Sequence, residues 1–242
     1  MLSEKPWKPQ AVMMLLLGIF ACLSFGALLL NVVIPKGELA APQWKFINFM
    51  VSTVALHGGA LVMIAFFLRE HQVGWKEAFG FNAPGLPRGM MLAVITVLLV
   101  TPLAWTLGKI SALVMEQVLV TPEVQSTVQT LQSSVDRSEQ YYFAFVAILI
   151  APVVEEILFR GIVYPSLKQS GRPQLALWVT SLAFAAIHGN AMSFVSLAVL
   201  GMVLIALYEK TNNLLVPIVT HSLFNLINFL FVLNPHWTEA LT

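Results

Sequence analysis

Charged residues and cysteines are scarce in this chain of 242 residues. Asp, Glu, Lys and Arg together make up 10% of it, whereas a soluble domain carries roughly 25%. The formal net charge of +1 gives no basic surface for nucleic acid. The lone cysteine, Cys22, allows no internal disulfide. These shortages exclude an ordinary soluble enzyme, a nucleic-acid-binding protein and a disulfide-stapled domain.

The chain instead contains long apolar runs, and 58% of its residues are hydrophobic. A transmembrane helix needs about 20 consecutive apolar residues. Seven segments stand out: Ala11–Ile34, Phe46–Leu68, Gly89–Met115, Gln140–Leu167, Gln174–His188, Ala191–Tyr208 and Leu214–Leu233. The fifth is too short to cross fully and turns at Gly189-Asn190 into the sixth. We therefore predict an all-α, polytopic transmembrane bundle of seven to eight helices, forming one membrane domain over residues 1–242.

The basic residues outside the apolar runs predict the orientation of the bundle. One set of loops holds eight of them: Lys5, Lys8, Arg69, Lys76, Arg88, Lys168, Arg172 and Lys210. The opposite set holds three: Lys36, Lys45 and Arg137. Because cytoplasmic loops carry an excess of Lys and Arg, we expect a cytoplasmic N-terminus.

Charge reappears inside the fourth apolar run, as Glu155, Glu156 and Arg160. An ionisable residue at bilayer depth is expensive and indicates a functional site by default. Residues four apart share a helix face, so Glu156 and Arg160 are predicted to form a structural pair. Glu155 then points elsewhere and is free to act as a general base. Pro152, one turn earlier, is expected to kink the helix.

Three further polar residues lie in apolar runs at a matching depth. With a rise of 1.5 Å per residue, Glu155 lies about 18 Å from the basic loops, His188 about 21 Å, Asn225 about 16 Å and His221 about 10 Å. Three separate segments thus bring a carboxylate, two imidazoles and an amide to one layer. We expect these groups to surround an internal polar cavity, with Glu155, His188, His221 and Asn225 as candidate catalytic residues.

These residues fall into three motifs: Glu155-Glu156-xxx-Arg160, Phe184-xxx-His188 and His221-xxx-Asn225. In this order they resemble the motifs of the CPBP family (CAAX protease and bacteriocin-processing, or Abi), which includes type II CaaX prenyl endopeptidases. The resemblance covers residues 140–233. It implies a bundle of about eight helices and an intramembrane protease that hydrolyses a peptide bond near the membrane interface.

The resemblance also implies a role for each motif. Glu155 and His188 would activate water, and His221 and Asn225 would donate hydrogen bonds to the oxyanion. Glu156, Arg160 and Phe184 would support them. The substrate would be a membrane-associated peptide or protein carrying a lipid, such as a prenylated CaaX-like C-terminus.

Three alternatives remain open from the residues. His188, His221 and either Glu155 or Glu156 would supply the three protein ligands of a catalytic zinc, although the HExxH spacing is absent. We favour a mechanism without a cofactor. The second alternative is a non-enzymatic membrane scaffold or immunity-type protein whose polar cluster positions another membrane protein. The third is a transporter or proton channel, since buried Glu and His also build proton relays, although the sequence has no inverted repeat to favour it.

One loop has an amphipathic pattern. In the segment of residues 122–139, Pro122 is a candidate first residue of a helix. Thr121, just before it, is a candidate helix cap. Val124, Val128, Leu131 and Val135 would then share one face. We predict an interfacial helix here.

Overall fold

The computed structural model describes residues 4–35, 37, 40–81, 85–134 and 136–234, and these residues form helices and connecting turns without strands. The elements are α1 (Pro9–Val33), α2 (Ala41–Thr53), η1 (Val54–Gly58), α3 (Gly59–Glu70), α4 (Trp75–Phe79), α5 (Leu86–Gln117), α6 (Ser126–Ser133), α7 (Arg137–Phe145), η2 (Val146–Ile150), α8 (Ala151–Glu156), η3 (Ile157–Val163), α9 (Tyr164–Lys168), α10 (Pro173–Ile187), α11 (Ala191–Thr211) and α12 (Leu215–Leu233). The protein is an all-α polytopic bundle, as predicted.

All seven predicted apolar segments are helical. Six helices are long and apolar enough to cross a membrane: Pro9–Val33, Gln43–Glu70, Leu86–Gln117, Arg137–Lys168, Ala191–Thr211 and Leu215–Leu233. The seventh, α10, is apolar but only 15 residues long, as expected for the segment thought too short to cross. An eighth crossing does not occur within the described ranges. This is an integral, multi-pass membrane protein.

Two of the spans are continuous rods interrupted by π-helical turns. One rod joins α2, η1 and α3, and the other joins α7, η2, α8, η3 and α9. In the second rod each π turn ends two residues before a proline, Pro152 after η2 and Pro165 after η3. Proline lacks an N–H and crowds the carbonyl four residues back, and a widened turn relieves both conflicts. The predicted disturbance at Pro152 is therefore a π turn, a feature that often marks functional sites.

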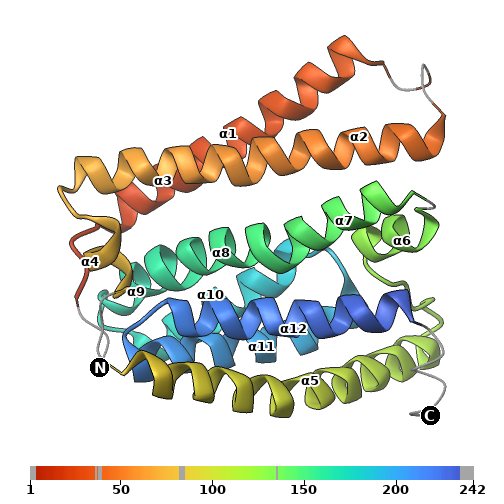
Figure 1. Cartoon of the computed structure of the whole chain (residues 1–242). Helices are drawn as coiled ribbons and strands as arrows, with labels where there is room; N and C mark the ends of the chain where they lie inside the picture. The colour runs from red at the N-terminus through yellow and green to blue at the C-terminus, as the bar shows by residue number, and fades with distance from the viewer. Residues whose placement is uncertain (1–3, 36, 38–39, 82–84, 135, 235–242) are drawn as a thin grey trace.

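The helices pack in three levels (Figure 1). The α1 helix and the α2–α3 rod lie together, the α7–α9 rod lies below them, and α5, α10, α11 and α12 form the remainder of the bundle. One apolar core joins α1, α3 and α4 to α8 and η3, and a second joins α5, α10, α11 and α12. Phe159 of η3 packs against both cores. The motif-bearing rod thus occupies the junction between them.

The turn between α10 and α11 confirms the predicted hairpin. Gly189 has a φ of +61°, a left-handed conformation that costs glycine little. The side chain of Asn190 accepts a hydrogen bond from the backbone N–H of Ser193 and caps α11. His188 is the residue that ends α10.

The prediction for residues 122–139 is wrong in its boundaries. Helix α6 begins at Ser126 instead of Pro122, so Thr121 caps no helix. Tertiary contacts tie the preceding residues to the α10–α11 turn: the Asn190 side chain donates to the carbonyl of Glu123, and the Gln125 side chain donates to Ser193. Val135 of the predicted face lies outside the described residues. A separate helix, α7, begins after Asp136, whose carboxylate accepts from the N–H of Ser138. Contacts with the α10–α11 turn therefore override the local cap signal.

Candidate functional site

Glu156 and Arg160 form the buried centre of the site. Arg160 Nη1 donates to Glu156 Oε1 at 2.8 Å, and both side chains are 0% exposed. The spacing of four residues places them on one face even though Arg160 lies in the widened η3 turn. A charge buried this deeply needs a close partner, and the predicted pair supplies it.

Arg160 is fixed by two further contacts from other helices. Its Nη2 donates to the carbonyl of Gly201 on α11 at 3.3 Å, and its guanidinium lies 4.3 Å from the centroid of the Phe184 ring on α10. Gly201 also lets α10 and α11 pack closely, because a Cβ there would lie 3.1 Å from Cα and Cβ of Ser181. The cation thus ties η3 to both neighbouring helices.

His221 of α12 completes the buried group. Its Nδ1 lies 2.9 Å from Glu156 Oε1, and the residue is 2% exposed. A carboxylate only accepts hydrogen bonds, so Nδ1 carries the proton in this contact. The hydrogen bond fixes the plane of the ring and leaves Nε2 as the atom available for chemistry.

Glu155 is the more exposed of the two glutamates. Its side chain is 19% exposed, whereas that of Glu156 is 0% exposed. Glu155 Oε2 lies 3.9 Å from Nε2 of His221, too far for a direct hydrogen bond but within the span that one bridging water can cover. Glu155 thus lies outside the Glu156–Arg160 pair, as predicted.

The ring of Phe184 lies between the two histidines. Its centroid is 4.9 Å from the His188 ring and 5.6 Å from the His221 ring, edge to face in both cases. His188 Nδ1 lies 2.7 Å from the carbonyl of Phe184, and a carbonyl accepts, so Nδ1 donates there too. Each imidazole therefore has its Nδ1 committed to a structural contact and its Nε2 left available.

Asn225 follows His221 by one turn of α12. Its Nδ2 donates to the carbonyl of Ala147 in η2 at 2.8 Å. An amide nitrogen carries two hydrogens, so this contact orients the group and leaves a second N–H. The same contact ties α12 to the π turn that precedes Glu155 in the rod.

A three-ligand metal site does not fit the arrangement of the described side chains. No group of three or more His, Cys, Asp or Glu side chains in those ranges lies close enough to hold one ion. Glu156 Oε1 is already committed to Arg160 and His221. We therefore derive no step through a metal.

Sequence reasoning missed the backbone groups that position the site. The carbonyls of Gly201 and Ala147 accept hydrogen bonds from Arg160 and Asn225. No side-chain pattern marks a carbonyl, so these two acceptors carry no signal in the sequence. The glycine at 201 was a weak hint, since a glycine within a helix often marks a close approach.

The comparisons with known proteins concern this same stretch. The family model described as "Type II CAAX prenyl endopeptidase Rce1-like" matches residues 137–227. Two curated proteins of Bacillus subtilis (strain 168) are similar over 90 residues: "Uncharacterized protein YpbD", at 32% identity, and "Putative membrane peptidase YdiL", at 27%.

These similarities are partial. They cover 36% and 37% of this chain, and 43% and 37% of the relatives' own lengths. No solved structure matches significantly. All the candidate site residues lie within the matched range. The stretch of chain that carries the site is therefore similar to type II CAAX prenyl endopeptidases, and the resemblance drawn from the three motifs is confirmed over residues 137–227.

Proposed function

We propose that this protein is an intramembrane endopeptidase that hydrolyses a peptide bond near the membrane interface. The observation that carries the proposal is the partly exposed Glu155 carboxylate facing Nε2 of a histidine that Glu156 and Arg160 hold in place. A carboxylate beside an oriented imidazole, within membrane-spanning helices, supports the proposal. The similarity to a family of membrane endopeptidases supports the same reaction class.

In the proposed mechanism Glu155 accepts a proton from a water molecule. The water oxygen attacks the carbonyl carbon of the peptide, and a tetrahedral intermediate with a negative oxygen forms. The C–N bond then breaks, and Glu155 returns the proton to the leaving amine. Nε2 of His188 helps to hold the water beside the carboxylate.

The negative oxygen of the intermediate needs donors that are already in place. We assign this role to the second N–H of Asn225 and to Nε2 of His221. The assignment requires His221 to carry a proton on both ring nitrogens during the reaction. The contacts of Asn225 with Ala147 and of His221 with Glu156 hold both donors still, and fixed donors stabilise developing charge most effectively.

The proposed substrate is a membrane-associated peptide whose lipid keeps the scissile bond at the bilayer, such as a prenylated CaaX-like C-terminus. The large apolar side chains exposed on the outer faces of the helices suit a protein that meets its substrate within lipid. A matched pair of peptides, with and without a farnesyl group on the cysteine, tests this point. Faster cleavage of the unmodified peptide in vesicles would overturn the substrate class.

Replacing Glu155 by glutamine tests the mechanism. A general base contributes about 10²–10⁴ in rate, so kcat/KM should fall by that factor in Glu155→Gln. Glu116→Gln, an exposed carboxylate at the end of α5, is the matched control and should cleave as fast as the wild type. Equal activity in the Glu155 variant would refute the proposed role.

Metal analysis of the active protein completes this experiment. We expect cleavage to persist after dialysis against a chelator, because the proposed mechanism uses no ion. Activity that vanishes with the chelator and returns with zinc would replace this mechanism by the zinc alternative. A wild type that binds a membrane protein without cleaving any peptide would favour the scaffold alternative.

We also propose that the N-terminus is cytoplasmic. Helices α4 and α9, the end of α3 and the start of α5 carry basic residues of the larger set. These helix ends lie at one end of the bundle (Figure 1). In a Cys22→Ser background, Lys76→Cys should resist a membrane-impermeant thiol reagent applied to intact cells, and Lys45→Cys should react. The reverse pattern would invert the topology.

A further inference from the structure

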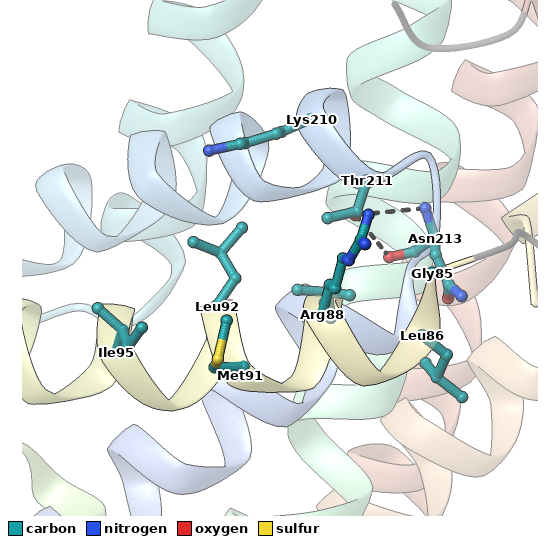
Figure 2. A pocket seen from close by; sticks show the side chains of 11 residues that line it. Gly85, Leu86, Arg88, Met91, Leu92, Ile95, Lys210, Thr211 and Asn213 are labelled. Atoms are coloured by element: carbon teal, nitrogen blue, oxygen red, sulfur yellow. Dashed lines mark hydrogen bonds between the residues drawn. The ribbon is translucent and has the colours of Figure 1, made fainter.

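A second polar feature lies well apart from the candidate active site in the chain, at the end of the bundle where α5 begins. A cleft of about 350 Å³ opens between the first turns of α5 and the turn that joins α11 to α12 (Figure 2). Its walls combine two cations with apolar side chains: Gly85, Leu86, Arg88, Gly89, Met91, Leu92, Ile95, Lys210, Thr211, Asn213 and Val216. None of the proposed catalytic residues lines it.

The charge of the cleft lining is positive. Arg88 and Lys210 both line it, and no acidic side chain of the described ranges does. Figure 2 shows Arg88 extending from α5 toward the turn at Thr211, with Lys210 on the opposite wall near Leu92. Two cations that face one cavity from different helices repel each other, so an anion between them would stabilise both.

Backbone and amide donors add to the attraction for an anion. Helix α5 is 32 residues long, begins after Gly85 and has no side-chain cap at its N-terminus. Pro87 has no N–H and Gly89 N–H donates to the carbonyl of Gly85, so the first turn offers the N–H groups of Leu86 and Arg88. These groups and the helix dipole favour a negative group. Asn213 is 3% exposed and lines the cleft. Its Nδ2 is buried and has no hydrogen-bond partner among the described residues, so an unsatisfied donor lies beside the cleft.

The remaining wall is apolar and continues along the helix toward the hydrocarbon region. Met91 is 61% exposed and Ile95 45% exposed, and with Leu92 they form the face of α5 that follows Arg88. A free inorganic anion gains nothing from such a wall, whereas an acyl chain does. The cleft thus offers one compartment for a phosphate and an adjoining one for hydrocarbon.

We propose that this cleft binds one phospholipid with an anionic headgroup. The phosphate lies between Arg88, Lys210 and the N-terminus of α5, and one acyl chain runs along Met91 and Ile95. Basic pockets between transmembrane helices at the cytoplasmic side are suited to anionic headgroups, and this end of the bundle carries the larger set of basic residues. The proposal is independent of the protease reaction.

Native mass spectrometry of the full chain in detergent, with added phosphatidylglycerol or phosphatidylcholine, tests it. We expect one phosphatidylglycerol to be retained in preference to phosphatidylcholine. Each cation near an anionic lipid contributes roughly a fivefold factor in affinity, so Arg88→Gln with Lys210→Gln should weaken retention about 30-fold. Each single variant should weaken it about fivefold.

The matched control is Lys76→Gln with Arg172→Gln, which removes the same charge from exposed positions at the same end of the bundle outside the cleft. This pair should retain the lipid as the wild type does. Equal loss in both pairs, or equal retention of the two lipids by the wild type, would overturn the proposal. So would displacement of the lipid by inorganic phosphate alone at equal concentration, because the acyl wall would then contribute nothing.

Discussion

Arg160 is the residue whose replacement tests the buried part of the site most directly. In Arg160→Met the side chain keeps much of its length, but the carboxylate of Glu156, 0% exposed, loses its 2.8 Å partner. Removing one member of a buried ion pair costs about 3–5 kcal/mol. The contact with the Phe184 ring contributes about 0.5–2 kcal/mol. We therefore expect the free energy of unfolding to fall by about 4–7 kcal/mol.

The double variant Glu156→Gln with Arg160→Met completes this test. It removes both charges, and the amide oxygen of the new glutamine can still accept from Nδ1 of His221. Replacing a whole buried pair is often nearly neutral, so the double variant should recover at least about 2 kcal/mol of the loss. Unfolding by SDS in mixed micelles, followed by far-UV circular dichroism, compares the wild type, each single variant and the double variant. Strictly additive losses would show that the two charges do not stabilise each other.

Two further substitutions test the packing that holds the site. Asn228→Leu removes the 2.9 Å hydrogen bond from Trp105 Nε1 and should cost about 0.6–1.7 kcal/mol in the same unfolding assay; an unchanged unfolding midpoint would contradict this. Gly80→Ala places a Cβ 1.9 Å from the carbonyl oxygen of Asn212 at a φ of +70°, and should cost more than the roughly 1–3 kcal/mol of backbone strain alone. Gly74→Ala, where a Cβ meets nothing within 4 Å, is the control and should leave the midpoint unchanged.

The membrane architecture was predictable because the bilayer imposes a length and a polarity on each span. Runs such as Ala11–Ile34 and Gly89–Met115 correspond to α1 and α5 with shifts of a few residues at their ends. The Glu156–Arg160 pair was predictable for a similar reason. It depends only on a spacing of four within one helix, and the structure confirms it.

Contacts between distant segments could not be read in the same way. Helix rise predicts one layer for His188, His221 and Asn225, but it does not predict the direction of any side chain. In the structure His221 is the histidine that contacts Glu156 and faces Glu155, whereas Nδ1 of His188 binds the carbonyl of Phe184. The rotation of each helix about its own axis decides this, and packing against neighbours sets that rotation.

The prediction of where α6 begins was wrong for a related reason. The cap signal at Thr121 is local, but Glu123 and Gln125 are held by contacts with Asn190 and Ser193. Propensity is a weak prior that tertiary contacts routinely override. The π turns could not be predicted from the sequence either, although two of them are followed by prolines, Pro152 and Pro165.

The amino-acid sequence by itself determined that this chain crosses a membrane several times and places a Glu-Glu-Arg group at bilayer depth, because hydropathy and helix periodicity are local properties. Only the tertiary structure decided which imidazole faces Glu155, which carbonyls fix Arg160 and Asn225, and that Arg88 and Lys210 share a cleft. Those relations depend on how separate helices rotate and approach one another, and that follows from the packing of the whole bundle.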